Sequence, residues 1–249
     1  MTRVFDERAK LLHLSSPMLF GMSVPPSAKP ADLVVRQVPA SVARPYIAAG
    51  HYSGTFPDST RESYAGFYSE TLSCVVTFGM GANHSAFTAV VPDIALGEYR
   101  ELTRLWVDDA CPRNTASRLV ASAIAKLPPE VRLIVSFADT AQGHAGYVYQ
   151  AMNFIYLGTT TPGKNLLDDE GKSVHPRLLG IYRMRRKEFA ELSGPEIARR
   201  LGWSFSDGSI KHRYVLPVGP PADRRKLRGK LQLRSMPYPK INQQHKAIA

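Results

Sequence analysis

Three polar side chains in the middle of the chain have the types and positions that group-transfer chemistry needs. Asp139 closely follows the apolar stretch 131–137, and a carboxylate at the end of a strand can orient or deprotonate a substrate. Arg104 lies in the alternating segment 101–107, and its guanidinium can hold an anionic or carbonyl group. Ser117 falls in the first turn of the next predicted helix, where free backbone N–H groups also bind anions. These residue types suit a site that holds an anionic or carbonyl group and moves a proton.

Aromatic and histidine side chains supply further candidate groups. His51 and Tyr52 begin the segment HYSG (51–54), directly after a predicted helix. At a helix end they can serve as ligands or proton donors on a mobile loop. His144 and Tyr149 belong to another predicted helix, which follows Asp139 in the chain.

Each of these residues also has a purely structural interpretation, and the sequence leaves the alternatives open. Arg104 can form a salt bridge with Glu101 or Asp108 on the face of its strand, and Ser117 can be an ordinary helix residue. Tyr149 can belong to the core, and Asp139 can cap a turn. Residues 51–54 can simply end the helix and cover it with an aromatic side chain.

The candidate residues lie on one continuous unit of alternating strands and helices. Residues 99–158 predict strand, helix, strand, helix, strand, because 101–107 and 131–137 alternate and the helix between them has an apolar stripe. Ligands of such α/β sheets bind beyond the carboxyl ends of the strands. Outside this unit we predict strands at 33–38, 72–78, 85–91 and 178–184, helices at 41–49 and from 193 to 201, a polar loop at 55–66 and an irregular insertion at 159–176.

The charge of the 249-residue chain is concentrated at its end. The formal net charge is +11, of which residues 209–249 carry +9 and the other residues +2. A nearly neutral body with a basic tail predicts a polyanionic partner such as DNA, with a simply solvated tail as the alternative. The candidate DNA-binding residues are Arg224, Arg225, Lys226, Arg228, Lys230 and Arg234.

Several other classes of protein are excluded by what the sequence lacks. The two cysteines, Cys74 and Cys111, give neither a disulfide framework nor zinc-ligand spacing, so we expect a reducing cytoplasm. There is no P-loop, no glycine-rich dinucleotide motif and no nucleophile elbow. No run of about 18 apolar residues is present, so no membrane span is expected.

Three segments of the chain resemble one known family. HYSG (51–54), ELTRLWVDDACPRNTASR (101–118) and VSFADTAQGHAGYVYQAMNFIYLG (135–158) are similar to the Mom DNA-modification proteins of bacteriophage Mu and its relatives, over roughly residues 33–185. That family is regarded as a divergent branch of the GNAT acyltransferase fold, so the resemblance implies a GNAT-like mixed central sheet flanked by helices. It also implies an enzyme that converts the exocyclic amine of adenine in double-stranded phage DNA to a carbamoylmethyl (acetamido) form. This shields the DNA from host restriction.

The resemblance also implies which residues act. It marks Tyr52, Arg104, Ser117, Asp139 and Tyr149 as functional positions, with Asp139 orienting or deprotonating the amine. Because adenine is stacked inside the duplex, the base must be flipped into a pocket, where tyrosine rings can stack on it or donate protons. An iron site is a further implication, with His51, Tyr52, Asp139 and Tyr149 as ligand types that iron accepts.

The donor-binding turn departs from the usual GNAT pattern. In the segment 113–118 both glycines of the pyrophosphate-binding turn are replaced. Arg113, Ser117 and Arg118 can compensate with charge and a hydroxyl group, so we expect acetyl-CoA or another small acyl donor here.

The expected organisation has three parts. Residues 1–30 form an N-terminal arm, 31–187 a GNAT-like catalytic domain, and 188–249 a basic appendage that contacts DNA. Two other functions remain open: an N-acetyltransferase acting on a protein or small amine, and a non-enzymatic DNA-binding module on a degenerate fold.

Overall fold

A computed structural model describes residues 24–81, 84–174 and 176–240, and it divides the chain into two compact units. The described part of the central unit comprises residues 24–138, 146–158 and 213–240, and the second unit comprises 139–145 and 159–212. Most of the predicted N-terminal arm lies outside the described residues.

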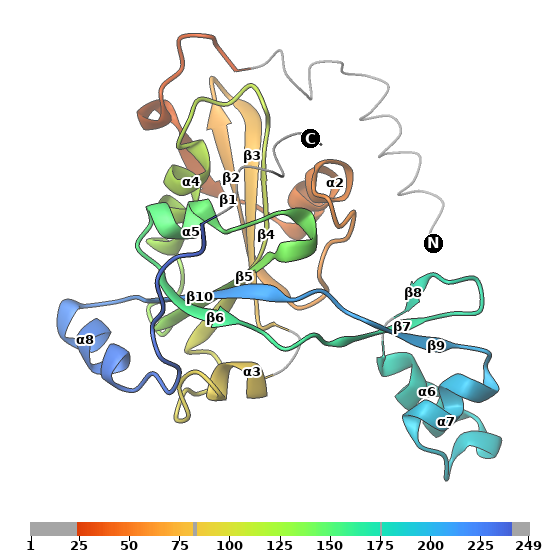
Figure 1. Ribbon diagram of the computed structural model, residues 1–249. Coiled ribbons are helices and arrows are strands. Elements are labelled where there is room, and N and C mark those ends of the chain that lie inside the picture. Colours follow the sequence, from red (N-terminus) through yellow and green to blue (C-terminus); the bar gives the residue numbers. More distant parts are fainter. Residues whose placement is uncertain (1–23, 82–83, 175, 241–249) are drawn as a thin grey trace. The chain divides into compact units, whose positions relative to one another are not determined.

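The central unit is built on a seven-stranded mixed sheet (Figure 1). The first four strands in its spatial order pair antiparallel, and β4 and β5 pair parallel. This arrangement confirms the predicted α/β (α+β) class with a mixed central sheet flanked by helices. In spatial order the strands are β1 (Val34–Gln37), β2 (Thr60–Tyr68), β3 (Thr71–Gly79), β4 (Tyr99–Val107), β5 (Leu133–Asp139), β10 (Lys211–Pro217) and β6 (Ile155–Thr159).

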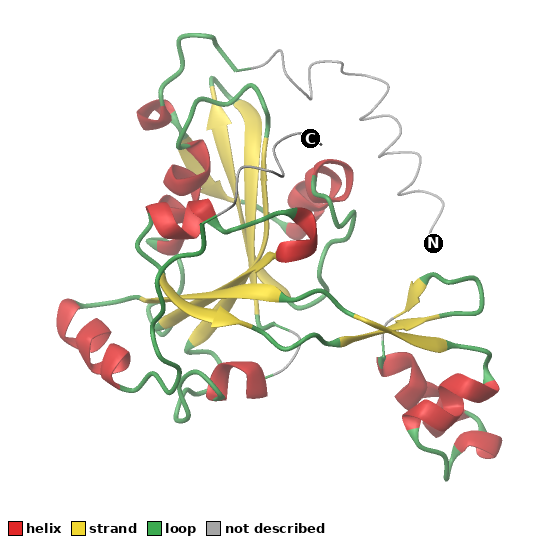
Figure 2. Cartoon of the chain, in the orientation of Figure 1, coloured by secondary structure: helices red, strands yellow, loops and turns green. Residues whose placement is uncertain are grey.

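Helices cover both faces of this sheet (Figure 2). On one face α4 (Thr115–Ile124) buries Leu119 and Val120 in the largest core cluster. On the other face α2 (Ala40–Gly50) packs Ala43 and Ile47 in a separate cluster with Trp106 of β4. The remaining helices of this unit are α3 (Ser85–Thr88), α5 (Tyr147–Ala151) and α8 (Pro221–Gly229).

The sheet opens between β4 and β5. The parallel pairing ends at Leu102↔Ser136, although β4 continues to Val107 and β5 to Asp139. At the same level one extra residue, Thr103, interrupts the register of β4 with β3, and such a bulge bends a strand. The two strands therefore separate beyond Leu102, while β4 stays paired with β3 on its other side.

The second unit has its own sheet and core. Its three strands are β7 (Lys164–Leu167), β8 (Ser173–Val174) and β9 (Ser204–Asp207), and its helices are α6 (Arg177–Arg185), η4 (Lys187–Phe189) and α7 (Gly194–Arg200). A capping box between Ser193 and Glu196 begins α7. The buried core consists of Leu166, Leu179, Phe189, Ile197 and Ala198.

Three local predictions are wrong. Residues 178–184 are helical, because Leu179 and Tyr182 lie three residues apart and both pack inward. Residues 85–91 contain the short helix α3, where we predicted a strand, and its Phe87 is buried against Tyr99. The predicted polar loop 55–66 becomes strand β2 from Thr60 onward.

The division into units also differs from the predicted boundary at residue 187. Residues 159–212 contain the whole small sheet with α6 and α7, whereas 213–240 belong to the central unit. Residues 213–240 belong to the central unit because strand β10 lies between β5 and β6 in the large sheet. No helix in the described residues is long and apolar enough to cross a membrane.

Candidate active site at the opening between β4 and β5

Helix α2 approaches β4 closely, and this positions the segment 51–55 beside β4. Helix α2 ends at Gly50, and a Cβ atom at this position would lie 2.1 Å from the indole nitrogen of Trp106. Only glycine fits there, so the chain leaves the helix next to β4. The imidazole Nδ1 of His51 shares a 2.9 Å hydrogen bond with the Ser53 hydroxyl, and its ring stacks 4.3 Å from that of Tyr52.

Arg104 ties this segment to β4. Its Nε donates to the carbonyl oxygen of Thr55 at 2.9 Å, and a second guanidinium nitrogen donates to the Thr55 hydroxyl at 3.0 Å. A third N–H donates to the carbonyl oxygen of Thr103. Burial lowers the pKa of Arg104, while the nearby charges of Tyr52 and Glu101 oppose that change. The guanidinium has five N–H donors, so two remain for a substrate within the part of the site that the structure describes.

Tyr149 is held rigidly at the same opening. It is 9% exposed, and its ring packs against those of Phe154 and Tyr214. Gly146, at φ 74°, begins α5, and a Cβ atom there would lie 2.5 Å from the Tyr214 ring. The hydroxyl of Tyr149 hydrogen-bonds to Ser136 of β5. The Ser136 hydroxyl also donates to the carbonyl oxygen of Leu102 at 3.3 Å, and its interaction with Tyr149 favours the ionised phenol.

Burial makes Tyr149 a neutral phenol. Desolvation raises its pKa to about 12, the Ser136 hydroxyl opposes this rise, and nearby Tyr52 and Glu101 add to it. At neutral pH this side chain can donate a proton or a hydrogen bond but cannot act as a base.

This pKa gives a stability prediction. The unfolded chain loses the Tyr149 proton near pH 10, whereas the folded protein keeps it to about pH 12. The stabilisation is therefore complete below pH 10 and is lost as the pH rises to about 12, by about 2 to 3 kcal/mol. Urea unfolding should be measured at pH 9 and at pH 11.5. Between these two pH values the free energy of unfolding should fall less for Tyr149→Phe than for the unmodified protein. Tyr147→Phe, at a 58% exposed position, should behave like the unmodified protein.

Glu101 is a member of this site that the sequence did not identify as functional. It acts electrostatically on both Arg104 and Tyr149. Its carboxylate oxygen lies 2.7 Å from where a Cβ atom of Gly81 would stand, so the turn at Gly81 leaves room for it. We call Tyr52, Glu101, Arg104, Ser136 and Tyr149 the opening cluster.

The predicted donor turn begins α4. Asn114 occupies the N-cap position in the left-handed conformation (φ 70°), and its side chain makes no capping hydrogen bond. The Ser117 hydroxyl donates to the carbonyl oxygen of Asn114 at 3.0 Å, which leaves its lone pairs available. Ser117 and Arg118 line an open groove with Pro30, Ala121 and Met152, while Arg113 is exposed just before the helix. The turn thus presents a hydroxyl group, a cation and a helix N-terminus along one groove.

Asp139 is the last residue of β5 and belongs to the second unit. One carboxylate oxygen accepts the backbone N–H of Ala141 at 3.0 Å, and the other accepts the Ser209 hydroxyl at 2.8 Å. The backbone N–H of His144 also donates to the Asp139 carbonyl oxygen. The carboxylate is therefore held in one orientation at the carboxyl end of its strand.

The predicted iron site finds no support. Across residues 24–81, 84–174 and 176–240, no three His, Cys, Asp or Glu side chains are arranged to hold a metal ion. Burial raises the pKa of Tyr149 and so disfavours the phenolate form that binds iron. The His51 ring nitrogen nearest the loop is bonded to Ser53.

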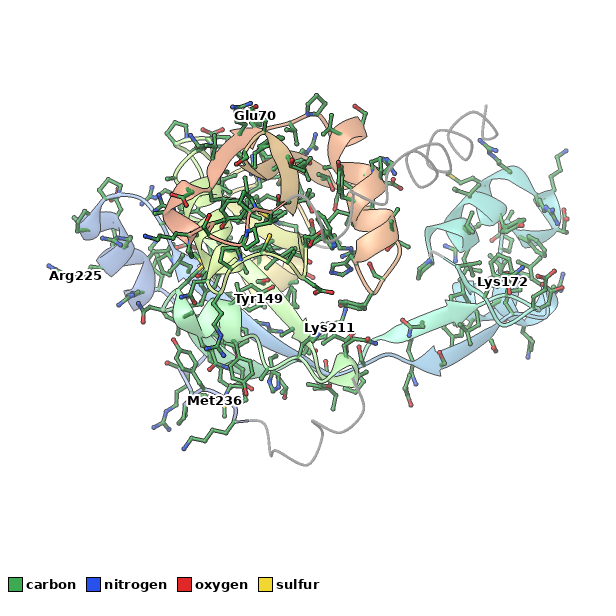
Figure 3. All side chains as sticks on the ribbon, turned by 90° about the horizontal axis from the view of Figure 1, so that it is seen from above. Glu70, Tyr149, Lys172, Lys211, Arg225 and Met236 are labelled. Carbon is green, nitrogen blue, oxygen red and sulfur yellow. The ribbon has the colours of Figure 1, made fainter. Side chains whose placement is uncertain are left out.

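The predicted DNA-binding residues gather mostly on α8. Leu227 is buried and anchors this helix, while Arg224, Arg225, Lys226 and Arg228 are exposed. Arg225 projects from α8 in Figure 3. Lys230 differs from the others because it forms an ion pair with Asp93 at 3.2 Å. Arg234 is exposed in the segment that follows.

Comparison with known proteins shows which family the chain belongs to. The mixed sheet and its flanking helices define a protein of the α+β class, with the opening cluster as its candidate site. The chain matches the Mom protein family over residues 32–240 and belongs to that family. It is 35% identical over 131 residues to the methylcarbamoylase Mom of Escherichia phage Mu. That alignment covers 51% of this chain and 54% of the relative, so the chain spans about half the length of the curated relative it matches.

Solved structures with a similar arrangement are acetyltransferases. A GNAT family acetyltransferase from Elizabethkingia anophelis, solved with acetyl-CoA bound, aligns with a TM-score of 0.40 and 12% identity, over 75% of this chain and 99% of that one. The ribosomal-protein-S18-alanine N-acetyltransferase of Escherichia coli gives 0.40 and 8%, over 76% and 95%. Similarity at this level assigns no ligand to the chain.

Proposed function

We propose that this protein is a transferase that modifies the exocyclic amine of adenine in double-stranded phage DNA to the carbamoylmethyl form and so protects that DNA from restriction in the host cell. The observation that carries the proposal is the match to the Mom protein family over residues 32–240, which includes the whole opening cluster. The exposed arginines of α8 support a polyanionic substrate. Mass spectrometry of nucleosides from DNA of cells that express the protein tests it.

The proposed chemistry follows from the properties of the amine. Its lone pair is delocalised into the purine ring, so the nitrogen is a weak nucleophile and must lose a proton when it bonds to the donor carbon. We propose Asp139 as the group that orients the amine and takes that proton. The leaving group of the donor needs a proton in turn, and the neutral phenol of Tyr149 can supply it.

The other members of the opening cluster have supporting roles. The ring of Tyr52 is 55% exposed and can stack on a base flipped out of the duplex. The two remaining N–H groups of Arg104 can hold a carbonyl or anionic group of the donor. Glu101 is a positioning residue, because its negative charge favours the protonated forms of Arg104 and Tyr149.

The groove at the start of α4 fits a small acyl donor such as acetyl-CoA. Its residues offer a hydroxyl group, arginine charges and free N–H groups, which suit a phosphate-bearing molecule. Attack on the carbonyl carbon of acetyl-CoA by itself would give an N-acetyl group. The carbamoylmethyl product therefore requires a donor whose CH2 carbon carries the leaving group and whose carbonyl carbon carries the amide nitrogen.

Replacing Ser117 by Ala tests the donor groove. The hydroxyl is removed, but α4 keeps its backbone, so we expect activity to fall about tenfold while DNA affinity stays unchanged. Single-turnover rates and duplex binding would be measured on the same preparation. Ser122→Ala, at a half-buried position of the same helix that does not line the groove, is the control. Full activity in Ser117→Ala would place the donor elsewhere.

The exposed arginines of α8 give a second test. If they bind phosphates, replacing Arg224, Arg225 and Arg228 by Gln should lower the slope of log affinity against log salt by about 0.9 for each phosphate that is no longer neutralised. Lys230→Gln is the matched control, since Asp93 already neutralises that charge. An unchanged slope in the triple variant would refute the assignment of α8 to DNA.

A further inference from the structure

The second unit carries a basic surface that the proposed function does not use. Arg183, Arg185, Arg186 and Lys187 follow one another at the end of α6 and the start of η4, and all are exposed. Within the described residues none of them forms an ion pair. We call these four residues together with Gly180, Ile181 and Met184 the α6 face.

Two lysines of the same unit are neutralised locally. Lys164 forms an ion pair with Asp207 on the small sheet. Lys172, at the hairpin between β7 and β8, forms one with Glu170 (Figure 3). The four cations of the α6 face differ from these two lysines, because none of them is in an ion pair within the described residues. Arg186 is fixed in place, because its guanidinium stacks over the Tyr182 ring at 4.7 Å and the Phe189 ring at 5.8 Å.

Apolar side chains lie among these charges. Met184 stands between two arginines and is 82% exposed, and Ile181, one turn earlier on the helix, is 39% exposed. Exposed apolar side chains framed by cations suit a partner that offers both phosphates and flat hydrophobic surface. Deoxyribose and base edges of DNA have this character, and methionine is among the residues that DNA-binding proteins insert against base steps.

Gly180 adds an independent observation. It lies inside α6, where glycine is less favourable than alanine. A Cβ atom added there would meet nothing within 4 Å, and its backbone is not in the left-handed region that requires glycine. The fold of the chain therefore gives no reason for a glycine at this position. A bare backbone on an exposed basic helix does allow another molecule to approach closely.

We propose that the α6 face is a second DNA-binding surface, which binds the phosphates and sugars of the duplex with Arg183, Arg185, Arg186 and Lys187 and packs Met184 against it. This rests on the proposed function, since it takes duplex DNA as the substrate. It adds a surface on the second unit (Figure 1) to the one expected on α8. Each of the two units thus has its own basic surface for the substrate.

The test uses the full chain and a fluorescent DNA duplex at several salt concentrations. Replacing Arg183, Arg185 and Lys187 by Gln should lower the affinity about tenfold or more and reduce the salt slope by about 0.9 for each phosphate that these side chains neutralise. Arg186 is left in place because it packs on two rings. The matched control replaces Lys164 and Lys172 by Gln, and its slope should equal that of the unmodified protein.

The outcomes separate this inference from the proposed function. A slope unchanged by the α6 substitutions but reduced by those in α8 would overturn the inference and leave the proposed function standing. If the unmodified protein does not bind duplex DNA at all, the proposed function fails first.

Gly180→Ala guards against an effect of misfolding. Alanine should stabilise α6 and raise the melting temperature by about 2–4 °C, yet weaken DNA binding by blocking the close approach. Met184→Ala should weaken binding without changing the salt slope, whereas Met184→Leu should retain it, because the apolar side chain carries no charge. Normal DNA affinity in both Gly180→Ala and Met184→Ala would overturn the proposed geometry.

Discussion

Replacing Asp139 by Asn is expected to lower the rate of DNA modification about 10²-fold or more without unfolding the protein. Asn keeps the size of the side chain, and its oxygen can still accept the backbone N–H of Ala141. It cannot act as a base, because it carries no negative charge. Single-turnover measurement of modified deoxyadenosine gives the rate directly.

Ser209→Ala is the control for this experiment. It removes the other hydrogen bond of the Asp139 carboxylate but leaves the charge in place. If Asp139 only stabilises the turn after β5, both variants should lose a similar small amount of stability and keep their activity. That outcome would contradict a chemical role for Asp139.

Replacing Tyr149 by Phe should also lower the rate about 10²-fold, because the phenol is the proposed proton donor. The ring packing with Phe154 and Tyr214 remains, so the fold should be preserved. Ser136 keeps its own hydrogen bond to the Leu102 carbonyl oxygen, which limits the disturbance. DNA affinity and the circular dichroism spectrum should match those of the unmodified protein.

The matched control is Tyr156→Phe. Tyr156 is another buried tyrosine of the same core, and removal of its hydroxyl group should leave the rate within about threefold. If Tyr149→Phe keeps full activity, the proton for the leaving group comes from another source. If both variants lose activity equally, the effect belongs to packing of the core.

The middle of the fold could be predicted from sequence because its patterns are strong. Alternation in 101–107 and 131–137 and the apolar stripe after Asn114 correspond to β4, β5 and α4. The pattern in 178–184 is ambiguous, since short apolar runs suit either a strand or a buried helix face. Strand β10 could not be placed, because its position between β5 and β6 depends on pairing with segments far away in the sequence.

The site shows the same limit. Arg104 and Tyr149 were found by type and by resemblance, and the structure brings both to the opening cluster. No sequence pattern marked Glu101 as a functional residue. It reaches the site because β4 pairs Glu101 with Gly79 on one side and with Val135 on the other. Sequence alone does not give that register.

The most direct test of the whole account is mass spectrometry of nucleosides from plasmid and phage DNA of bacteria that express the protein. We predict a new deoxyadenosine derivative, heavier by one carbamoylmethyl group, in cells with the unmodified protein and a strong decrease of it in cells with Tyr149→Phe. Unchanged deoxyadenosine in cells that contain folded protein would contradict the account. An acetylated protein or small amine in the same cells would show instead that the chain is an acetyltransferase of another substrate.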